Sequence, residues 1–339
     1  MTLLNIFPAE KIQKPFRFTN RTRLFTGFSC NYNCKFCFYR DCKNESNFIK
    51  EQIEIFKKYG IKDIDLSGGE PTIIPNWFDL LVELKRPFRN ICVITNGSMT
   101  SNFDFFKRSV ESGLTEVLVS IHGTKNIHNK MTGICGSWEK TIKTLENASR
   151  IGIKTKVNTV ITKDNYKILP ELVKVINNYD VNYYNFIPFR IHKEGNDNLD
   201  NCIDFTSIVP YINESINILN NKIKPKIRYI PYCVIEDNAK YVTSFISRLV
   251  DENEWSVYLQ TIVEKIIKES DKREVNTTDK WKNEIKALKE ISEEATTYKF
   301  SCAKCKYFLI CGGFWRTYYE VWGGNEFQPI LGDRIDVLN

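Results

Sequence analysis

The first two-thirds of the chain alternates short apolar runs with stretches of helical spacing. Between the runs, apolar residues recur at intervals of three and four, as Trp138, Ile142 and Leu145 do, which indicates amphipathic helices. Strands that alternate with helices are typical of a parallel sheet with right-handed crossovers. The runs are rich in β-branched and aromatic residues, and we predict strands at 23–29, 63–69, 90–97, 116–123, 154–162 and 182–189.

Six strand–helix units are too few for a closed eight-stranded barrel, so the predicted fold class is α/β, a partial (β/α)6 TIM-like barrel over residues 21–229. We expect residues 1–20 to be an N-terminal extension. The pattern changes after residue 230, where a smaller cysteine-rich domain is predicted over 230–339. Within it, a charged stretch at about 240–298 has apolar residues at helical intervals and predicts an insertion of two or three helices.

Unusual residues follow the predicted strands directly. The segment "CNYNCKFC" (30–37) follows the first strand, "GGEP" (68–71) the second and "SIHG" (120–123) lies at the end of the fourth. Ligands of parallel α/β folds bind at the carboxyl ends of the strands. We therefore expect one active site at this rim.

Composition and charge narrow the class of protein. The chain has 42% hydrophobic and 26% charged residues, no apolar run of the ~18–20 residues that a membrane span needs, and no secretory signal. We expect a cytoplasmic protein with no membrane partner, in which the 11 cysteines stay reduced and serve metal or redox chemistry. The net charge of +7 fits a solvated surface or an acidic partner. Without an RRM, KH or zinc-finger motif, no nucleic-acid partner is expected.

Cys30, Cys34 and Cys37 are spaced C-x3-C-x2-C and supply three thiolates on one loop. A structural zinc needs a fourth ligand, and a ferredoxin-type cluster normally takes four cysteines, for which Cys42 is the candidate. Three ligands instead leave one iron open to a substrate or cofactor.

With Phe36 before the third cysteine, this spacing resembles the signature of the radical S-adenosylmethionine (SAM) enzymes, and residues 68–70 resemble their GGE motif. The resemblance extends over about residues 20–190. It implies a [4Fe–4S] cluster whose open iron chelates SAM, and reductive cleavage of SAM to a 5′-deoxyadenosyl radical that takes hydrogen from a substrate. The resemblance also implies the following roles: Phe36 near the adenine, Gly68, Gly69 and Glu70 at the SAM amino group, Ser120 and Lys130 near the ribose or methionyl carboxylate, and Asn158, Ile187 and Pro188 completing the pocket.

A second cysteine group, Cys302, Cys305 and Cys311, resembles the closing part of the twitch and SPASM domains that carry auxiliary clusters in this family. The resemblance implies one auxiliary [4Fe–4S] cluster, two in total, with Cys233 as the fourth ligand. A four-cysteine zinc site is the alternative.

Three residues near the rim are candidates for acting on or binding the substrate. Cys135 is a candidate hydrogen-atom donor, His122 a base and Arg190 a partner for a substrate anion; an inert thiol, a structural histidine and a surface pair are the alternatives. Relatives of this build modify peptides or oxidise small polar molecules, and we favour a peptide, with a small polar metabolite as the alternative. The cysteine motif begins too early in the sequence for a leader-peptide-binding domain before it, which weakens the peptide hypothesis.

The resemblance also implies a flavodoxin- or ferredoxin-type electron donor as partner. A non-catalytic iron–sulfur electron carrier is the competing class, but such a protein does not need the GGEP motif.

Overall fold

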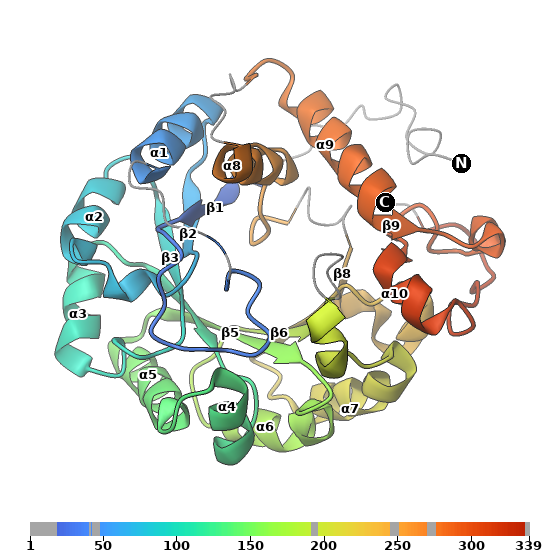
Figure 1. The fold of residues 1–339 in the computed structure, drawn as a ribbon, viewed down its shortest axis with the longest axis horizontal. Coiled ribbons are helices and arrows are strands. Elements are labelled where there is room, and N and C mark those ends of the chain that lie inside the picture. Colours follow the sequence, from blue (N-terminus) through green and yellow to red (C-terminus); the bar gives the residue numbers. More distant parts are fainter. Residues whose placement is uncertain are drawn as a thin grey trace.

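The computed structural model describes residues 19–40, 42, 48–190, 196–244, 251–269 and 276–335. Its centre is one parallel sheet whose strands are hydrogen-bonded in the order of the sequence, curved into an open barrel (Figure 1). The strands are β1 (Arg21–Phe25), β2 (Asp63–Ser67), β3 (Asn90–Thr95), β4 (Glu116–Ser120), β5 (Lys154–Ile161), β6 (Tyr183–Pro188), β7 (Lys224–Arg228) and β8 (Val242–Thr243).

Helices cover the outer face of this sheet, and the core lies between the two layers. Side chains such as Leu24, Ile64 and Val117 point into it and are fully buried. The covering helices are α1 (Phe48–Tyr59), α2 (Trp77–Leu84), α3 (Phe103–Ser112), α4 (Lys125–Thr132), α5 (Ser137–Ile151), α6 (Leu169–Ile176) and α7 (Phe205–Ile218), seen as a ring in Figure 1.

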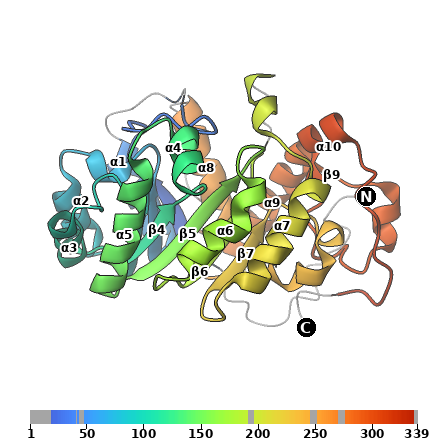
Figure 2. The same ribbon diagram turned by 90° about the horizontal axis from the view of Figure 1, so that it is seen from below.

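The C-terminal part adds α8 (Val257–Glu269), α9 (Lys280–Ala295) and α10 (Arg316–Trp322). A two-stranded antiparallel ribbon, β9 (Thr296–Thr297) with β10 (Phe314–Trp315), joins α9 to α10. This region docks on α7, where the rings of Phe205 and Tyr318 stack with centroids 4.1 Å apart. Figure 2 shows it beside one end of the barrel.

The predicted open α/β barrel is confirmed, but the sheet is longer than the six strands that the sequence predicts. The additional strand β7 reads "KPKIR", and its charges and proline argue against a strand when seen in isolation. Strand β8 has only two residues and lies within the segment assigned to the second domain. Strand β7 adds in parallel to the edge that β6 offers, and β8 adds in turn to the edge of β7.

The helices of the predicted insertion contact the barrel as well as each other. Helix α8 packs against α1 and β1 as well as against α9. The segment 251–256 before it spans the open side of the sheet: the Ser256 amide donates to the Arg21 carbonyl at 2.8 Å, and Glu254 accepts from both terminal nitrogens of Arg228 at 2.8 and 2.7 Å. The insertion therefore links the β1 end of the sheet to β7.

Among the described residues, no helix combines the length and the apolar character needed to cross a bilayer.

Candidate functional site

The GGE segment lies against the backbone that leads into the first cysteine loop. The Gly69 amide donates to the Gly27 carbonyl, and the Glu70 amide to the Ser29 carbonyl, each at 2.9 Å. A Cβ atom on Gly68 would lie 2.0 Å from the Gly27 oxygen, and one on Gly69 would lie 2.0 Å from the Ser29 oxygen. Only glycine permits this approach, which fixes Cys30 beside the end of β2.

The Glu70 carboxylate is buried and faces the protein. Burial raises its pKa, and the surrounding donors act in the opposite direction. These donors are the Thr72 amide (3.2 Å) and hydroxyl (2.6 Å), the Thr95 hydroxyl (2.8 Å) and the Asn96 amide (2.7 Å). The carboxylate therefore ties the end of β2 to the end of β3.

Asn96, which sequence reasoning does not select, connects β3 to the cysteine loop. Its side-chain amide donates to Asn31 Oδ1 at 2.9 Å and lies 3.9 Å from Cys30 Sγ. The signal in the sequence is its position directly after β3, in "TNG", which also reads as an ordinary turn.

The other side of the cysteine loop rests on the end of α4. The amides of Asn33 and Lys35 donate to the carbonyls of Thr132 and Met131, both at 3.1 Å. The Phe36 ring meets the His122 ring edge-on, with centroids 4.5 Å apart. The loop therefore lies over the carboxyl ends of the strands, as Figure 2 shows at the upper edge of the barrel.

The three thiols of this loop are free, with Cys30 exposed and Cys34 and Cys37 half-buried. Although Cys30 is exposed as a residue, partial desolvation of its thiol raises its pKa, and burial together with the two neighbouring thiols raises the pKa of Cys34 to about 12. Thiols of this kind bind metal as thiolates, so loading the site releases protons. The chemistry of the donors fits an iron–sulfur cluster.

The second cysteine group is brought together by the fold. Cys233, Cys302, Cys305 and Cys311 line one pocket, although 68 residues separate the first two in sequence. Burial, with the other three thiols, raises the pKa of Cys233 to about 12, and burial raises that of Cys311 to about 12. The pocket is otherwise mainly aromatic, with Tyr232 stacked on Tyr307 at a centroid distance of 4.8 Å.

The spacing of the thiols bears on which metal each group suits. In the part of the chain that the structure describes, no three thiols lie within 4.8 Å of one another. Four thiolates around one zinc ion at ~2.3 Å would lie about 3.8 Å apart. Both groups are more open than a single zinc ion requires.

Three of the residues proposed for the SAM pocket lie on the inner face of the sheet: Ser120 on β4, Asn158 on β5 and Ile187 on β6. Ser120 is in register with Asn158, and Asn158 with Asn185. The Asn185 side-chain amide donates to Asn158 Oδ1 at 2.7 Å, while its own buried Oδ1 has no partner among the described residues. Asn158, Asn185 and Ile187 line a cavity inside the barrel. The sequence analysis did not select Asn185. The predicted pocket residue Pro188 is the last residue of β6, at the rim.

The remaining predicted residues have specific environments. The Lys130 ammonium pairs with Asp164 at 2.8 Å and is exposed. His122 is buried, burial lowers its pKa well below the usual value, and its Nδ1 accepts from the Val160 amide at 3.2 Å. Cys135 is exposed on the loop between α4 and α5.

Arg190 follows β6 and lies over the ring of Trp315, with its Cζ 3.5 Å from the ring centroid. Burial lowers its pKa, while Tyr229 and Glu264 act in the opposite direction. The barrel rim and the C-terminal segment meet at this contact.

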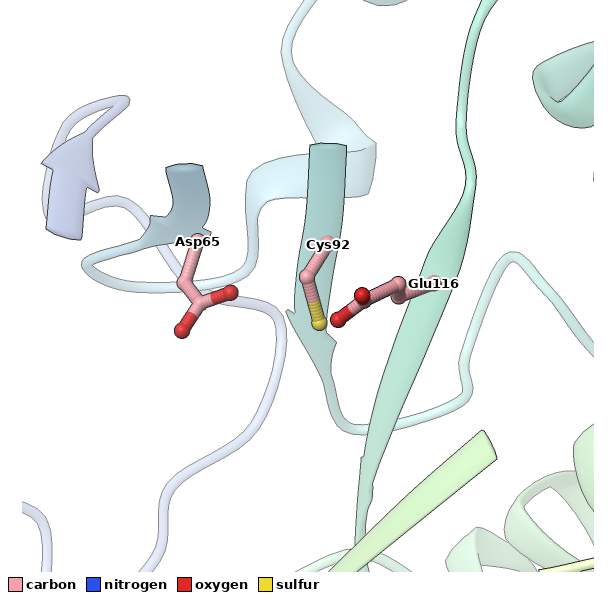
Figure 3. A group of neighbouring side chains, drawn as sticks. All are labelled: Asp65, Cys92 and Glu116. Atoms are coloured by element: carbon pink, nitrogen blue, oxygen red, sulfur yellow. The ribbon is translucent and has the colours of Figure 1, made fainter. Parts of the chain in front are cut away.

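A different cluster lies lower in the barrel, where Asp65, Cys92 and Glu116 point toward one another from β2, β3 and β4 (Figure 3). Three cations already pair with it: Arg21 pairs with Asp65 and with Glu116, the latter at 3.0 Å, and both Lys154 and Lys156 pair with Glu116, Lys154 at 2.9 Å. Burial alone would raise the pKa of Glu116, but Lys156 and Arg21 outweigh it and lower that pKa to about 2. The cluster is a buried ion-pair network, and its carboxylates are neutralised without a metal.

Comparison with known proteins gives a family match over the barrel. Residues 24–176 match the model of the radical SAM superfamily. The chain is 26% identical over 338 residues to the tungsten-containing aldehyde ferredoxin oxidoreductase cofactor-modifying protein of Pyrococcus furiosus, covering 90% of this chain and 91% of that protein. It is 30% identical to a probable GTP 3′,8-cyclase of Sulfurisphaera tokodaii, over 42% of this chain and 48% of that one.

Solved structures share the fold. SuiB of Streptococcus suis bound to its precursor peptide SuiA superposes with a TM-score of 0.62 at 15% identity, over 92% of this chain and 75% of that chain. The enzyme anSMEcpe with bound AdoMet and a Cp18Cys peptide superposes with a TM-score of 0.54 at 18% identity, over 87% and 89%.

Proposed function

Since the chain carries a radical SAM domain, we propose that it is an enzyme that cleaves SAM reductively and abstracts hydrogen from a substrate in the barrel. Cys30, Cys34 and Cys37 would hold the [4Fe–4S] cluster. When bound, this cluster supplies one electron to SAM, which breaks into methionine and a 5′-deoxyadenosyl radical.

The observation that carries the proposal is the backbone pairing of the GGE segment with the residues before Cys30. This pairing holds the thiol loop and the ends of β2 and β3 as one rim, through Gly69, Glu70 and Asn96. A rim fixed in this way can hold a metal group and an amino acid side by side at the carboxyl ends of the strands.

The chain's residues have separate tasks in this proposal. Because protein donors occupy the Glu70 carboxylate, the SAM amino group meets the backbone carbonyls of the GGE segment, and Glu70 positions them. Phe36 packs near the adenine. Ser120, Asn158, Ile187 and Pro188 form the inner wall. Lys130 reaches the SAM carboxylate only by leaving Asp164.

The C-terminal thiols would hold a second cluster. The convergence of Cys233, Cys302, Cys305 and Cys311 on one pocket supports this assignment, and their open spacing favours a cluster over zinc. An auxiliary cluster there can take up the electron that an oxidised substrate releases. A flavodoxin- or ferredoxin-type protein would supply the reducing electron to the first site.

We favour a peptide as substrate, as in the sequence-based hypothesis. The shared fold with SuiB, whose structure holds a precursor peptide, is compatible with it. A small polar molecule is the second candidate, because the relative that matches 90% of this chain is described as a cofactor-modifying protein.

The test is formation of 5′-deoxyadenosine by anaerobically reconstituted protein with dithionite and SAM. We expect the wild type to form it and the Cys30→Ala, Cys34→Ala and Cys37→Ala variants to lose it. Cys42→Ala is the matched control, because Cys42 would be essential only if the loop held a ferredoxin-type cluster with four cysteine ligands. If the wild-type protein carries iron but forms no 5′-deoxyadenosine, the result contradicts the enzyme proposal and favours the electron-carrier hypothesis.

A further inference from the structure

We propose that Arg190, which lies over the ring of Trp315, binds an oxyanion of the substrate, either a carboxylate or a phosphate. This inference rests on the proposed function and names the chemistry that its substrate carries. The position of Arg190 supports it. Arg190 follows β6 at the carboxyl ends of the strands, and Trp315 follows Cys311 by four residues. A ligand at this guanidinium lies between the barrel rim and the second group of thiols.

Among the described residues, the guanidinium lacks a partner for its charge. No carboxylate of these residues forms an ion pair with Arg190, and its Nε is buried without an acceptor. The nearby Glu264 is half-exposed and is paired with Arg23 at 3.3 Å. Arg190 is half-buried, and stacking on tryptophan offsets only part of the hydration that its charge loses. The difference favours an added anion.

Two other arginines of the barrel, Arg228 and Arg23, already have acidic partners among the described residues, unlike Arg190. Arg228 donates both terminal nitrogens to Glu254 at 2.7 and 2.8 Å. Arg23 donates to the Tyr39 hydroxyl at 2.6 Å as well as to Glu264. A planar guanidinium with open edges suits a bidentate oxyanion.

Tyr229 lines two cavities. One is the barrel cavity, and the other is also lined by Cys311 and Trp315. The φ of Tyr229, 66°, is unusual for a bulky residue, and its ring lies 5.7 Å from that of Trp315. Strained backbone of this kind persists where the surrounding structure holds it. Tyr229 thus borders both cavities and lies beside Trp315, the residue that Arg190 contacts.

The experiment titrates reconstituted full-length protein with four probes at constant ionic strength, by calorimetry: acetyl-Ala-Glu-Ala-amide, its Gln counterpart, glutarate and pyrophosphate. We expect at least one anionic probe to bind, and the neutral Gln peptide to bind at least about tenfold more weakly than the Glu peptide if that is the probe bound. The Arg190→Met variant should bind that anionic probe about tenfold or more weakly than the wild type does. Arg190→Lys should fall between, because it keeps the charge and loses the planar fork.

Arg86→Met is the matched control, since Arg86 is exposed on the outer surface and the variant loses the same charge. It should bind all probes as the wild type does. Tighter binding of the Glu peptide than of glutarate identifies a peptide source, the reverse order a small acid, and preference for pyrophosphate a phosphate. Equal binding by wild type and Arg190→Met, or no anion bound at about 10 mM, would overturn the proposal. Because these titrations do not require SAM cleavage, failure of the proposed function would appear separately, as absence of 5′-deoxyadenosine from the wild type.

Discussion

At the residue scale, the site depends on small groups that let backbone segments meet. Gly68 and Gly69 contribute no side chain, yet they set the position of the first thiol loop, because any Cβ would occupy the space of a carbonyl oxygen. Glu70 and Asn96 then link this contact to β3. The chemistry of the cysteines therefore depends on residues that do not themselves bind metal.

We predict that Gly69→Ala loses iron from the first site and lowers 5′-deoxyadenosine formation by more than about tenfold. The new methyl group would force the GGE segment away from residues 27–29 and break its two hydrogen bonds, at about 1 kcal/mol each, in addition to about 1–3 kcal/mol of overpacking. Iron per chain and the thermal unfolding midpoint measure the effect.

Gly136→Ala is the control for that variant. Gly136 has a positive φ of 79°, but a methyl group added to it would meet nothing within 4 Å, so only a backbone cost of about 1 kcal/mol is expected. If Gly69→Ala behaves like Gly136→Ala, the close approach is not what positions the loop.

At the element scale, the strands are joined by buried charges as well as by their hydrogen-bonded ladders. Arg21, Asp65, Glu116 and Lys156 come from β1, β2, β4 and β5 and form one network inside the barrel. Removing one member of such a network leaves a buried charge without its partner, which costs more than the pair itself contributes.

We therefore predict that Glu116→Gln destabilises the metal-free protein by about 3–5 kcal/mol at pH 7, measured by urea unfolding. The folded pKa of about 2 lies below the usual value of about 4.3, so this stabilisation is present above pH ~4.3 and is lost as the pH falls from there toward 2. The difference between variant and wild type should shrink over that range. The exposed pair of Lys107 and Glu111, 3.8 Å apart, provides the control Glu111→Gln, with an effect below about 0.5 kcal/mol. A pH-independent difference would show that repacking, rather than charge, causes the loss.

At the scale of the whole molecule, the Arg190–Trp315 contact joins the barrel, which carries the first thiol group, to the C-terminal segment, which carries most of the second. The first belongs to the loop after β1, and the second joins Cys233 to a segment beyond α9. The segment 251–256 and helix α8, which lie between Cys233 and Cys302 in sequence, contact the barrel.

We predict that replacing Cys302, Cys305 and Cys311 together by Ala lowers the iron content by about four per chain and leaves some SAM cleavage uncoupled from substrate. Cys233→Ala alone should give a similar loss of iron if it is the fourth ligand. Iron, sulfide and zinc analysis on reconstituted protein measures both. Unchanged iron, or one zinc lost per chain, would contradict an auxiliary cluster at this site.

The sequence by itself determined the parallel order of β1–β6, because apolar period and turn residues are local properties that each segment carries alone. It also determined the donor chemistry of the first thiol loop, since Cys30, Cys34 and Cys37 lie within eight residues. Only the tertiary structure decided that β7 and β8 extend the sheet, since "KPKIR" becomes a strand on account of the edge beside it. The same holds for the convergence of Cys233 with Cys302, Cys305 and Cys311, for the occupied carboxylate of Glu70, and for the stacking of Arg190 on Trp315. Each depends on contacts between residues far apart in sequence, and local pattern does not contain them.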